Sequence, residues 1–342
     1  MPPTDQPDAP QIVLAHGGGG ELMQSLIKSH IVPRLGNELL NGLTDGAVLG
    51  RVSGDLVFTT DAFVVTPLEF PGGDIGRLAV CGTVNDLAMM GARPLALSLA
   101  MVVEEGTALA LIDRILDSIA ESARQAGTCI ATGDTKVIER RGGGGMILTT
   151  AGLGERIAQS ALDIARIQPG DRLIINGVIA EHGLAIMAVR EGFEFDTQLR
   201  SDVAPLNGLV EAVLSAGCDV KFMRDPTRGG LATVLADVAD ETSLSVEIEE
   251  SALPMDTAVR HAAELLGLDP LTVANEGKCL VCVGAEDADK VVSILRQHRL
   301  GLEAAVIGRI TEVAPPLIEM ITTAGGRRVV QRPYGEELPR IC

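Results

Sequence analysis

The spacing of apolar residues alternates along the chain between helical and strand-like periods, which predicts an αβ protein. The clearest helix covers residues 107–126, with Thr107 as its expected N-cap and Gly127 just past its end. Residues 74–91 predict a second helix, and residues 47–60 predict a pair of strands joined by a turn. Short apolar runs predict three further strands in this part of the chain, at 95–103, 129–132 and 146–152.

A Pro-Gly pair at 169–170 fits a type II turn and follows this first half. We therefore expect the domain boundary between residues 155 and 170. Beyond it, short strands alternate with helical segments, which predicts a second, mixed αβ domain. The expected strands are 172–176, 219–223, 279–283 and 305–309, and the expected helices are 180–191, 205–215, 228–241, 255–266 and 286–297. From residue 323 onward Gly, Pro and Arg interrupt every period, which predicts an extended tail.

Composition narrows the class of protein. The 342 residues suit two domains, and the 46% hydrophobic content is enough for packed cores. The 46 acidic residues outnumber the 28 basic ones, and the chain has no Trp and one Tyr, so a nucleic-acid or acidic-membrane binder is not expected. The sequence contains no membrane-length apolar run, and residues 1–11 predict a disordered leader in place of a secretion signal. These features predict a cytoplasmic protein.

The cysteines do not form a disulfide framework, because they are scattered over a long chain. Cys279 and Cys282 form a CxxC within an apolar run that predicts a buried strand, where the two side chains point to opposite faces. We interpret them as core residues, which disfavours the alternative of a thiol redox protein. The six cysteines are Cys81, Cys129, Cys218, Cys279, Cys282 and Cys342.

Two glycine runs, Gly17 to Gly20 and Gly142 to Gly145, match neither the P-loop nor the dinucleotide-binding pattern. The second run predicts a hairpin loop. The first run is either a flexible lead-in or, because a helical segment follows it, a loop whose free N–H groups close over phosphates. The residues in question are Gly17, Gly18, Gly19 and Gly20.

Five aspartates lie at the ends of apolar runs, where αβ folds commonly hold ligands. They are Asp45, Asp61, Asp86, Asp134 and Asp225. Converging carboxylates repel one another and so imply a cation, and Mg²⁺ is usually held by one or two carboxylates together with water and phosphates. Lys136 follows Asp134 closely and is either a phosphate-binding charge or a solvated loop lysine.

Polar segments also interrupt the second half of the chain and its end. In DPTRGGL (225–231), Thr227 is either an anion contact or a plain helix N-cap, and NEGK (275–278) contains Glu276. Cys342 is the last residue, and a tail of about nine residues reaches at most roughly 30 Å, far enough for a cleft in its own or a neighbouring subunit.

Taken together, these segments resemble the HypE family of hydrogenase maturation factors, which are PurM-like ATP-dependent enzymes. The resemblance covers almost the whole chain, and the terminal PRIC is specific to that family. It rests on HGGGGELM (16–23), LTDGAVLG (43–50), residues 58–92, GDTKV (133–137), DPTRGGL (225–231), NEGK (275–278) and PRIC (339–342).

The resemblance implies an α/β (α+β) fold in which two-domain subunits form a homodimer through their N-terminal sheets, with ATP near that interface. It implies an N-terminal domain at 12–160, a C-terminal domain at 165–322 and a flexible tail at 323–342 that carries the terminal cysteine.

The resemblance also implies an activity. The carbamoyltransferase HypF places a carbamoyl group on Cys342, ATP-dependent dehydration converts the S-carboxamide to an S-thiocyanate, and the cyano group passes to iron on the HypC–HypD complex. The implied catalytic residues are Cys342, Glu276 as the base and Lys136. The implied nucleotide contacts are Gly17, Gly18, Gly19, Gly20, Asp61, Asn85, Asp134, Lys136 and Thr227. The implied Mg²⁺ ligands are Asp45, Asp61, Asp86, Asp134 and Asp225, with an orienting role for Lys136 as the alternative for Asp134.

Three alternatives differ in what they require of the chain. Selenophosphate synthetases carry a reactive Cys or selenocysteine in the N-terminal glycine loop, and this chain has no Cys before Cys81. Thiamine-phosphate kinases have no use for a terminal PRIC. A non-catalytic scaffold would bind ATP without turnover and would not need the last three residues.

Overall fold

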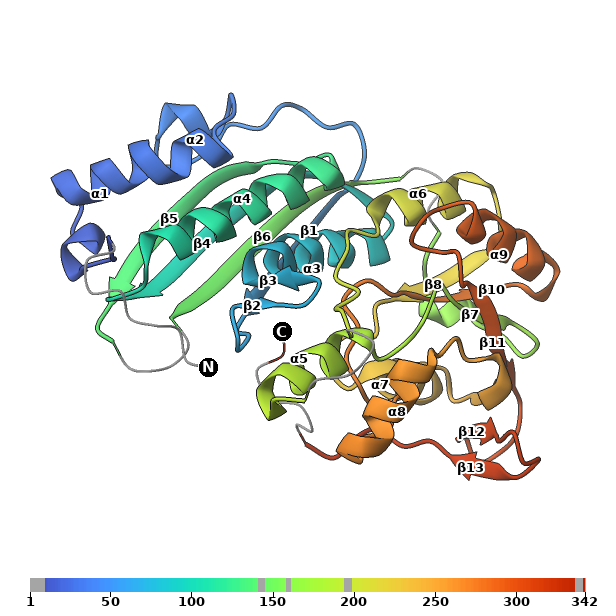
Figure 1. Cartoon of the computed structure of the whole chain (residues 1–342). Coiled ribbons are helices and arrows are strands. Elements are labelled where there is room, and N and C mark those ends of the chain that lie inside the picture. The colour runs from blue at the N-terminus through green and yellow to red at the C-terminus, as the bar shows by residue number, and fades with distance from the viewer. Residues whose placement is uncertain (1–9, 141–144, 158–160, 194–198, 336–340, 342) are drawn as a thin grey trace.

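The computed structural model describes residues 10–140, 145–157, 161–193, 199–335 and 341, which form two αβ domains (Figure 1). Residues 1–9 of the predicted leader, most of the second glycine run and Cys342 lie outside these residues. The leader prediction is wrong for its last two residues. The Pro10 carbonyl accepts a hydrogen bond from the N–H of Leu109, and Gln11 forms a β-bridge with Ala108.

The N-terminal domain is built on a four-stranded sheet in the order β1-β6-β4-β5. Strands β1 and β6 are antiparallel, as are β6 and β4, whereas β4 and β5 are parallel. Helices α3 and α4 cover one face of this sheet (Figure 1). The bounds are β1 Leu56–Phe63, β4 Ala92–Glu104, β5 Ile130–Ile138, β6 Met146–Arg156, α3 Ile75–Met89 and α4 Leu109–Ala126.

Local signals set the ends of the two helices. Asp74 caps α3 by accepting a hydrogen bond from the N–H of Arg77 at 2.9 Å, and Gly127 ends α4 with a φ of +70°. The predicted N-cap of α4 is wrong, because Ala108 occupies that position and the Thr107 hydroxyl donates instead to the Glu104 carbonyl.

The predicted strand pair over residues 47–60 is also wrong. Only its second half forms a strand, β1, and this strand pairs with the distant β6. Residues 47–55 bury no apolar face, since Val48 is 90% exposed, so they have nothing with which to hold a local hairpin.

Short elements complete the N-terminal domain. Helices α1 (Glu21–Leu26) and α2 (Val32–Leu35) flank a π-turn at Ile27–Ile31 and lie beside α4 and the β5 edge (Figure 1). A two-stranded ribbon joins β2 (Glu69–Phe70) to β3 (Gly73–Asp74). The 3₁₀ turns of the chain are Leu14–Gly17, Leu40–Gly42, Ile164–Arg166, Glu250–Ala252 and Ala285–Asp287.

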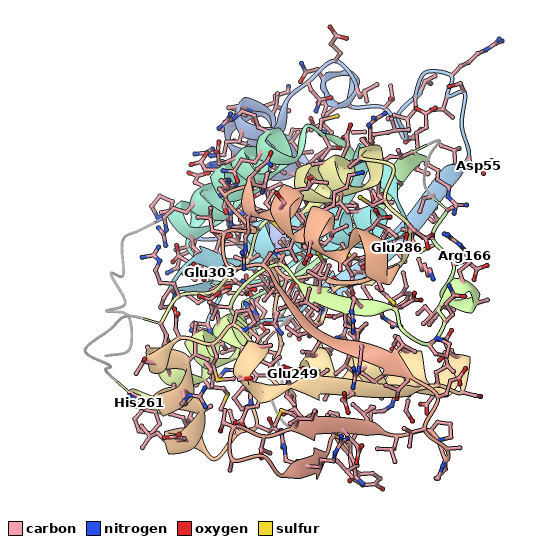
Figure 2. All side chains as sticks on the ribbon, turned by 90° about the vertical axis from the view of Figure 1, so that its right-hand side faces the viewer. Asp55, Arg166, Glu249, His261, Glu286 and Glu303 are labelled. Atoms are coloured by element: carbon pink, nitrogen blue, oxygen red, sulfur yellow. The ribbon has the colours of Figure 1, made fainter. Side chains whose placement is uncertain are left out.

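The C-terminal domain is built on a seven-stranded sheet in the order β13-β12-β9-β11-β7-β10-β8, antiparallel except for the β12–β9 pair. Helix α7 packs on one face, and α6 and α9 pack on the other. Helices α5 and α8 add to the core of the N-terminal domain. The turned view of Figure 2 shows Glu249 on this sheet and His261 on α8 at the edge of the molecule. The bounds are β7 Arg172–Ile175, β8 Val220–Arg224, β9 Ser245–Glu249, β10 Leu280–Val283, β11 Ala305–Thr311, β12 Ile318–Ile321, β13 Arg327–Val329, α5 Glu181–Glu191, α6 Asn207–Ser215, α7 Gly230–Thr242, α8 Thr257–Leu266 and α9 Ala288–Arg296.

The CxxC residues occupy the core as the strand period predicts. Cys279 packs in the cluster on the α6 and α9 face, whereas Cys282 packs in the cluster on the α7 face. Burial raises the pKa of the Cys279 thiol to about 12 and also raises the pKa of the Cys282 thiol. Both thiols are therefore held protonated inside the sheet, which is the core role predicted for them.

The predicted extended tail is wrong for its first part. Residues Arg327–Val329 form β13 against β12, and Val330 is buried in the core on the α7 face. Ile341 is also buried, at 3% exposure. Among the described residues, no helix is both long and apolar enough to span a bilayer.

Candidate active site

Four carboxylates meet in a small cavity of about 30 Å³ where the two domains join. Asp61 comes from β1 and Asp86 from α3 in the N-terminal domain. Asp225 follows β8, and Glu276 precedes β10, in the C-terminal domain. The other lining residues are Phe63, Gly82, Thr227 and Arg228.

The contact between β1 and α3 explains how two of these carboxylates come together. Asp61 lies between Thr59 and Phe63 on the face of β1 that α3 covers. The Thr59 hydroxyl donates a 2.8 Å hydrogen bond to Asp86. Gly82 lets α3 approach this closely, because a Cβ there would lie 2.8 Å from the Phe63 ring.

The cavity carries an excess of negative charge. Burial, followed by repulsion from Asp86, raises the pKa of Asp225 to about 7. Burial likewise raises the pKa of Asp86, and burial together with repulsion from Asp225 raises the pKa of Glu276 well above its ordinary value. The nearest cation, Arg228, approaches Asp61 only to 3.7 Å. Such a group of acids favours a bound cation or a proton to be exchanged.

Glu276 has a side-chain oxygen that is available to bind a ligand. Its Oε1 is buried and has no hydrogen-bond partner among the described residues. An unpaired buried oxygen that faces three aspartates fits a ligand that brings positive charge or a donor group.

A metal ion would need more than these side chains. Within the described ranges, no three His, Cys, Asp or Glu side chains are placed to hold one ion. Mg²⁺ commonly takes only one or two carboxylates and completes its shell with water and phosphate oxygens. The cavity therefore fits Mg²⁺ that arrives with a nucleotide.

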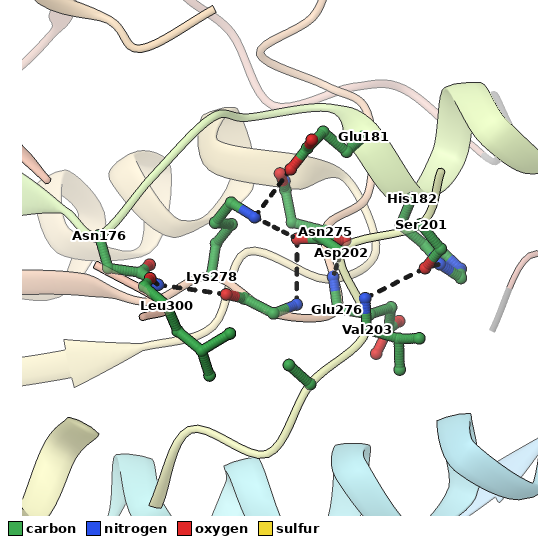
Figure 3. Close-up of polar contacts among 12 residues, drawn as sticks. Asn176, Glu181, His182, Ser201, Asp202, Val203, Asn275, Glu276, Lys278 and Leu300 are labelled. Carbon is green, nitrogen blue, oxygen red and sulfur yellow. Dashed lines mark hydrogen bonds and ion pairs between the residues drawn. The ribbon is translucent and has the colours of Figure 1, made fainter. Parts of the chain in front are cut away.

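The main chain of Glu276 is held by the residues around it (Figure 3). Asp202 accepts hydrogen bonds from the N–H groups of Glu276 at 3.1 Å and Gly277 at 3.0 Å. Lys278 donates to both Asp202 and Glu181 at 3.0 Å. The Glu276 carboxyl thus projects from a fixed backbone.

The predicted nucleotide contact at Asn85 is wrong. This amide is 1% exposed, and it donates to the carbonyls of Ala204 and Glu276 and accepts from the N–H of Leu206. Its oxygen and its nitrogen are both engaged by the backbone of the other domain. Asn85 therefore holds the Glu276 main chain instead of a ligand.

A second, larger cavity of about 460 Å³ lies between the N-terminal helices and the β5 edge. Three of the four predicted loop glycines line it, as do Asp134 and Lys136. Gly17 fits tightly, because a Cβ there would lie 2.8 Å from the backbone nitrogen of Val137. Gly20 is not in the lining and serves as the N-cap of α1. The lining glycines are Gly17, Gly18 and Gly19.

The apolar wall of this cavity was not identified from the sequence. It comes largely from α1, the following π-turn and strand β4. The apolar residues of such a segment look the same in the sequence whether they face a protein core or a ligand cavity. The wall includes Met23, Ile27, Ile31, Leu35, Leu99, Met101 and Ile130.

Asp134 and Lys136 lie within β5, not in a loop after it. Across the sheet, Asp61 pairs with Thr150, Thr150 pairs with Leu99, and Leu99 pairs with Gly133. The adjacent row of paired residues connects Ala62 to Asp134 in the same way. Directly paired residues share a face, so Asp134 projects from the face opposite to Asp61.

The prediction that all five aspartates bind metal at one site is therefore wrong for a single chain, because they do not come together in it. Three strand spacings also separate β1 from β5, which is about 14 Å. The Asp134 Oδ2 atom lies 3.3 Å from the Lys136 Nζ atom, as expected if Asp134 orients Lys136, which is the alternative role predicted for it. Asp45 is exposed and lines neither cavity.

Thr227 lines the acidic cavity and does not cap a helix. The residue at the N-cap of α7 is Gly229, with a φ of +75°, and no side chain caps this helix. The N-cap alternative for Thr227 is thus excluded, and its side chain stays beside Asp225 and Glu276.

The chain matches AIR synthase related protein, N-terminal domain, over residues 43–156 and AIR synthase related protein, C-terminal domain, over residues 168–315. Carbamoyl dehydratase HypE of Rhizobium leguminosarum bv. viciae is 46% identical over 335 residues, which cover 97% of this chain and 95% of that protein. The solved structure of hydrogenase maturation protein HypE in complex with ATP is 40% identical and superposes with a TM-score of 0.92, covering 96% of this chain and 99% of that one. A solved HypE–HypF complex contains a chain that is 41% identical, with a TM-score of 0.79 and coverage of 92% and 100%.

Proposed function

Since the chain belongs to the AIR synthase related family and, within it, to the HypE carbamoyl dehydratases, we propose that it dehydrates an S-carboxamide on Cys342 to an S-thiocyanate at the expense of ATP. The product would supply the cyano ligands of the iron in [NiFe] hydrogenase. The observation that carries the proposal is the buried, unpaired Glu276 oxygen among three aspartates.

The reaction needs a leaving group and a base. The amide oxygen attacks the γ-phosphorus of ATP and ADP leaves, which turns a poor leaving group into phosphate. The C–O bond then breaks, phosphate carries away the amide oxygen, and loss of both N–H protons leaves the C≡N bond.

Glu276 is our candidate for the group that removes an amide proton. Its raised pKa makes the carboxylate a stronger base than an exposed glutamate. The hydrogen bonds from Asn85 to its carbonyl and from its N–H to Asp202 fix its backbone, so the base is oriented before the substrate arrives.

The other residues would handle phosphate. Asp61, Asp86 and Asp225 would hold Mg²⁺, which neutralises phosphate charge when it is bound, and Thr227 would contact the nucleotide. Gly17 to Gly19 and Lys136 line the larger cavity, across the sheet from Asp61, so they would contact the nucleotide of a neighbouring subunit and help to exclude water from a phosphorylated intermediate that water would hydrolyse.

We also propose that two copies pair through the open face of the N-terminal sheet. No helix among the described residues covers this face, which exposes Phe58 (68%) and Leu56 at one end of β1 and Ile147 at the far end of β6. An apolar face of this kind suits burial against a second copy. Lys136 projects from the same face, so pairing would bring it to the partner subunit.

Other proteins would act before and after this chain. The solved complex of a similar protein supports HypF as a partner, and we propose HypF as the carbamoyl donor. HypC–HypD is proposed as the acceptor of the cyano group, following the family resemblance.

The test follows the mass of the C-terminal peptide. We expect the carbamoyltransferase and carbamoyl phosphate to add a carbamoyl group to Cys342, and Mg-ATP then to remove one water from that adduct. Glu276→Gln should carry the carbamoyl group and bind ATP but lose dehydration by at least about a hundredfold, the usual contribution of a general base. Cys342→Ala is the matched control and should bind ATP without acquiring any adduct. An unmodified Cys342 in a protein that binds ATP would refute the proposal and favour the scaffold.

A further inference from the structure

Two segments of the C-terminal domain carry the residues that this domain contributes to the acidic cavity. The turn after β8 carries Asp225 and Thr227, and the segment before β10 carries Glu276. Asp225 and Glu276 are both acids, and like charges favour separation of the two segments that carry them. The structure therefore needs a link that holds the turn and the segment at a fixed distance.

Asn275, the residue before Glu276, is fully buried and binds the turn directly. Its backbone N–H donates to the Pro226 carbonyl at 3.0 Å, and its side-chain Nδ2 donates to the same oxygen, also at 3.0 Å. Pro226 lies between Asp225 and Thr227 in the chain. The two donors of Asn275 therefore hold the turn at its centre.

The other bonds of the Asn275 side chain fix its orientation. Nδ2 also donates to the Val273 carbonyl at 3.0 Å, and Oδ1 accepts from the N–H of Ala180 at 2.7 Å. Because a carbonyl only accepts and a backbone N–H only donates, these partners allow one orientation of the amide. Ala180 is the N-cap of α5 and has a φ of +71°, which is uncommon for a residue with a Cβ, and its bond to Asn275 helps to hold it there.

The turn and the segment meet a second time at the start of α7. Gly230 has a φ of +59°, and a Cβ there would lie 2.5 Å from the carbonyl oxygen of Leu271 and 2.6 Å from that of Val273. The N–H of Ala232 donates to the same Leu271 carbonyl at 2.8 Å. Glycine at position 230 thus permits this close approach, and the turn packs directly on the chain that leads to Asn275.

Asn176 supports the later part of the same segment and offers a comparison (Figure 3). This amide is also fully buried. It donates to the carbonyls of Gly277 at 3.2 Å and Leu300 at 2.7 Å, and it accepts from the N–H of Cys279 at 2.8 Å. The side chains of Asn176 and Asn275 thus make three bonds each, but only the bonds of Asn275 reach the turn after β8.

We propose that Asn275 is a positioning residue that couples the turn at 225–227 to Glu276, so that a nucleotide bound at the turn and the proposed base keep one relative position. Its effect on dehydration rests on the proposed function, whereas its effect on the turn does not. Asn275 transfers no proton, because protein groups engage both of its Nδ2 hydrogens and its Oδ1. It acts through the backbone of Pro226 and through the main chain that it shares with Glu276.

The test compares Asn275→Ala with Asn176→Ala in the full-length protein. Calorimetry gives the Kd for Mg-ATP, and the mass of the tail peptide gives the rate of dehydration in a single turnover at saturating Mg-ATP. We expect Asn275→Ala to raise the Kd about fivefold, the factor that one net hydrogen bond is worth. The rate should fall about a hundredfold, the loss that a misplacement of roughly 1 Å can cause. Asn176→Ala also removes three side-chain bonds and should lower the melting temperature by a similar amount, but its Kd for Mg-ATP should equal that of the wild type.

An unchanged Kd in Asn275→Ala, or an equal rise of the Kd in Asn176→Ala, would overturn the coupling. If Asn275→Ala binds Mg-ATP more weakly but the wild type never dehydrates a carbamoylated tail, the link to the turn stands and the proposed function falls. If the wild type dehydrates the tail and Asn275→Ala matches it in both Kd and rate, the coupling falls and the proposed function stands.

A measurement on the wild type decides the matter if Asn275→Ala does not fold. Coupling is reciprocal, so Mg-ATP should slow hydrogen exchange at the Ala180 N–H about fivefold, although Ala180 lines neither cavity. The N–H of Cys279, which binds Asn176, should exchange equally fast with and without Mg-ATP. Unchanged exchange at Ala180 would overturn the coupling.

Discussion

The buried acid Asp225 should make the protein less stable as the pH rises. Its pKa is about 7 in the folded protein, against 3.8 for the ordinary group. The folded state thus holds a proton that the unfolded state releases, so stability falls as the pH rises between these two values. Asp225→Asn removes this titration while keeping the shape of the side chain.

The magnitude follows from the raised pKa. Between about pH 5.5 and about pH 8, the free energy of unfolding of the variant should rise by about 2 kcal/mol relative to the wild type. About one and a half pH units of this interval lie below the folded pKa, and each contributes about 1.4 kcal/mol. The comparison stays above the isoelectric point of about 4.7, which keeps the protein charged. Mg-ATP at about a hundred times its Kd should stabilise the wild type by about 2.7 kcal/mol and the variant by much less, since Asp225 would hold part of that ligand.

Urea denaturation at the two pH values, with and without Mg-ATP, measures both effects. Asp55→Asn is the matched control, because Asp55 is exposed at the start of β1, away from the cavity (Figure 2). It should show neither the pH-dependent gain nor the loss of stabilisation by nucleotide. A constant difference between wild type and Asp225→Asn at both pH values would refute the reasoning, because it would mean that the charge of Asp225 is compensated in the folded state.

Two further predictions concern the stability of the chain and its pairing with a second copy. Asn85→Ala should lower the free energy of unfolding by about 2–5 kcal/mol in urea denaturation, because it removes the Asn85 partner of the Ala204 carbonyl and of the Leu206 N–H and leaves the Glu276 carbonyl only the 3.5 Å bond from the N–H of Ala204. Asn207→Ala, which loses a single bond to Ala126, should cost about 1 kcal/mol, and an equal cost for the two would contradict the role of Asn85. Phe58→Asp should convert the proposed dimer to monomers in sedimentation experiments by placing a charge on the open sheet face. Leu265→Asp introduces the same charge on exposed α8 and should leave the mass unchanged, while a dimeric Phe58→Asp protein would exclude this interface.

The parts of the fold that depend on local spacing could be predicted from the sequence. Helix α4 has a strongly amphipathic pattern and a glycine at its end. The apolar run of β10 and the residue before it place Cys279 and Cys282 in the cores on opposite faces of the sheet. The strand predicted over residues 47–55 does not form, because β1 pairs with a strand some ninety residues away and no local signal in the sequence indicates that partner.

The acidic group was predicted as a group, but its membership depended on three-dimensional register. Asp134 has the same sequence context as Asp61, yet the order of four strands puts the two side chains on opposite faces. Asn85 is polar and lies beside Asp86, and only its backbone partners distinguish a buried support from a ligand contact.

The acidic cavity draws its walls from both domains, and this couples catalysis to the contact between them. A rigid-body separation of the domains would break the Asn85 bonds to Ala204 and Glu276 and would withdraw Asp61 from Asp225 in the same movement. Opening would then disperse the like charges and relieve their repulsion, whereas a bound cation would draw the domains together. Repulsion among the four carboxylates therefore favours separation of the two domains, and a cation bound between them would oppose that separation.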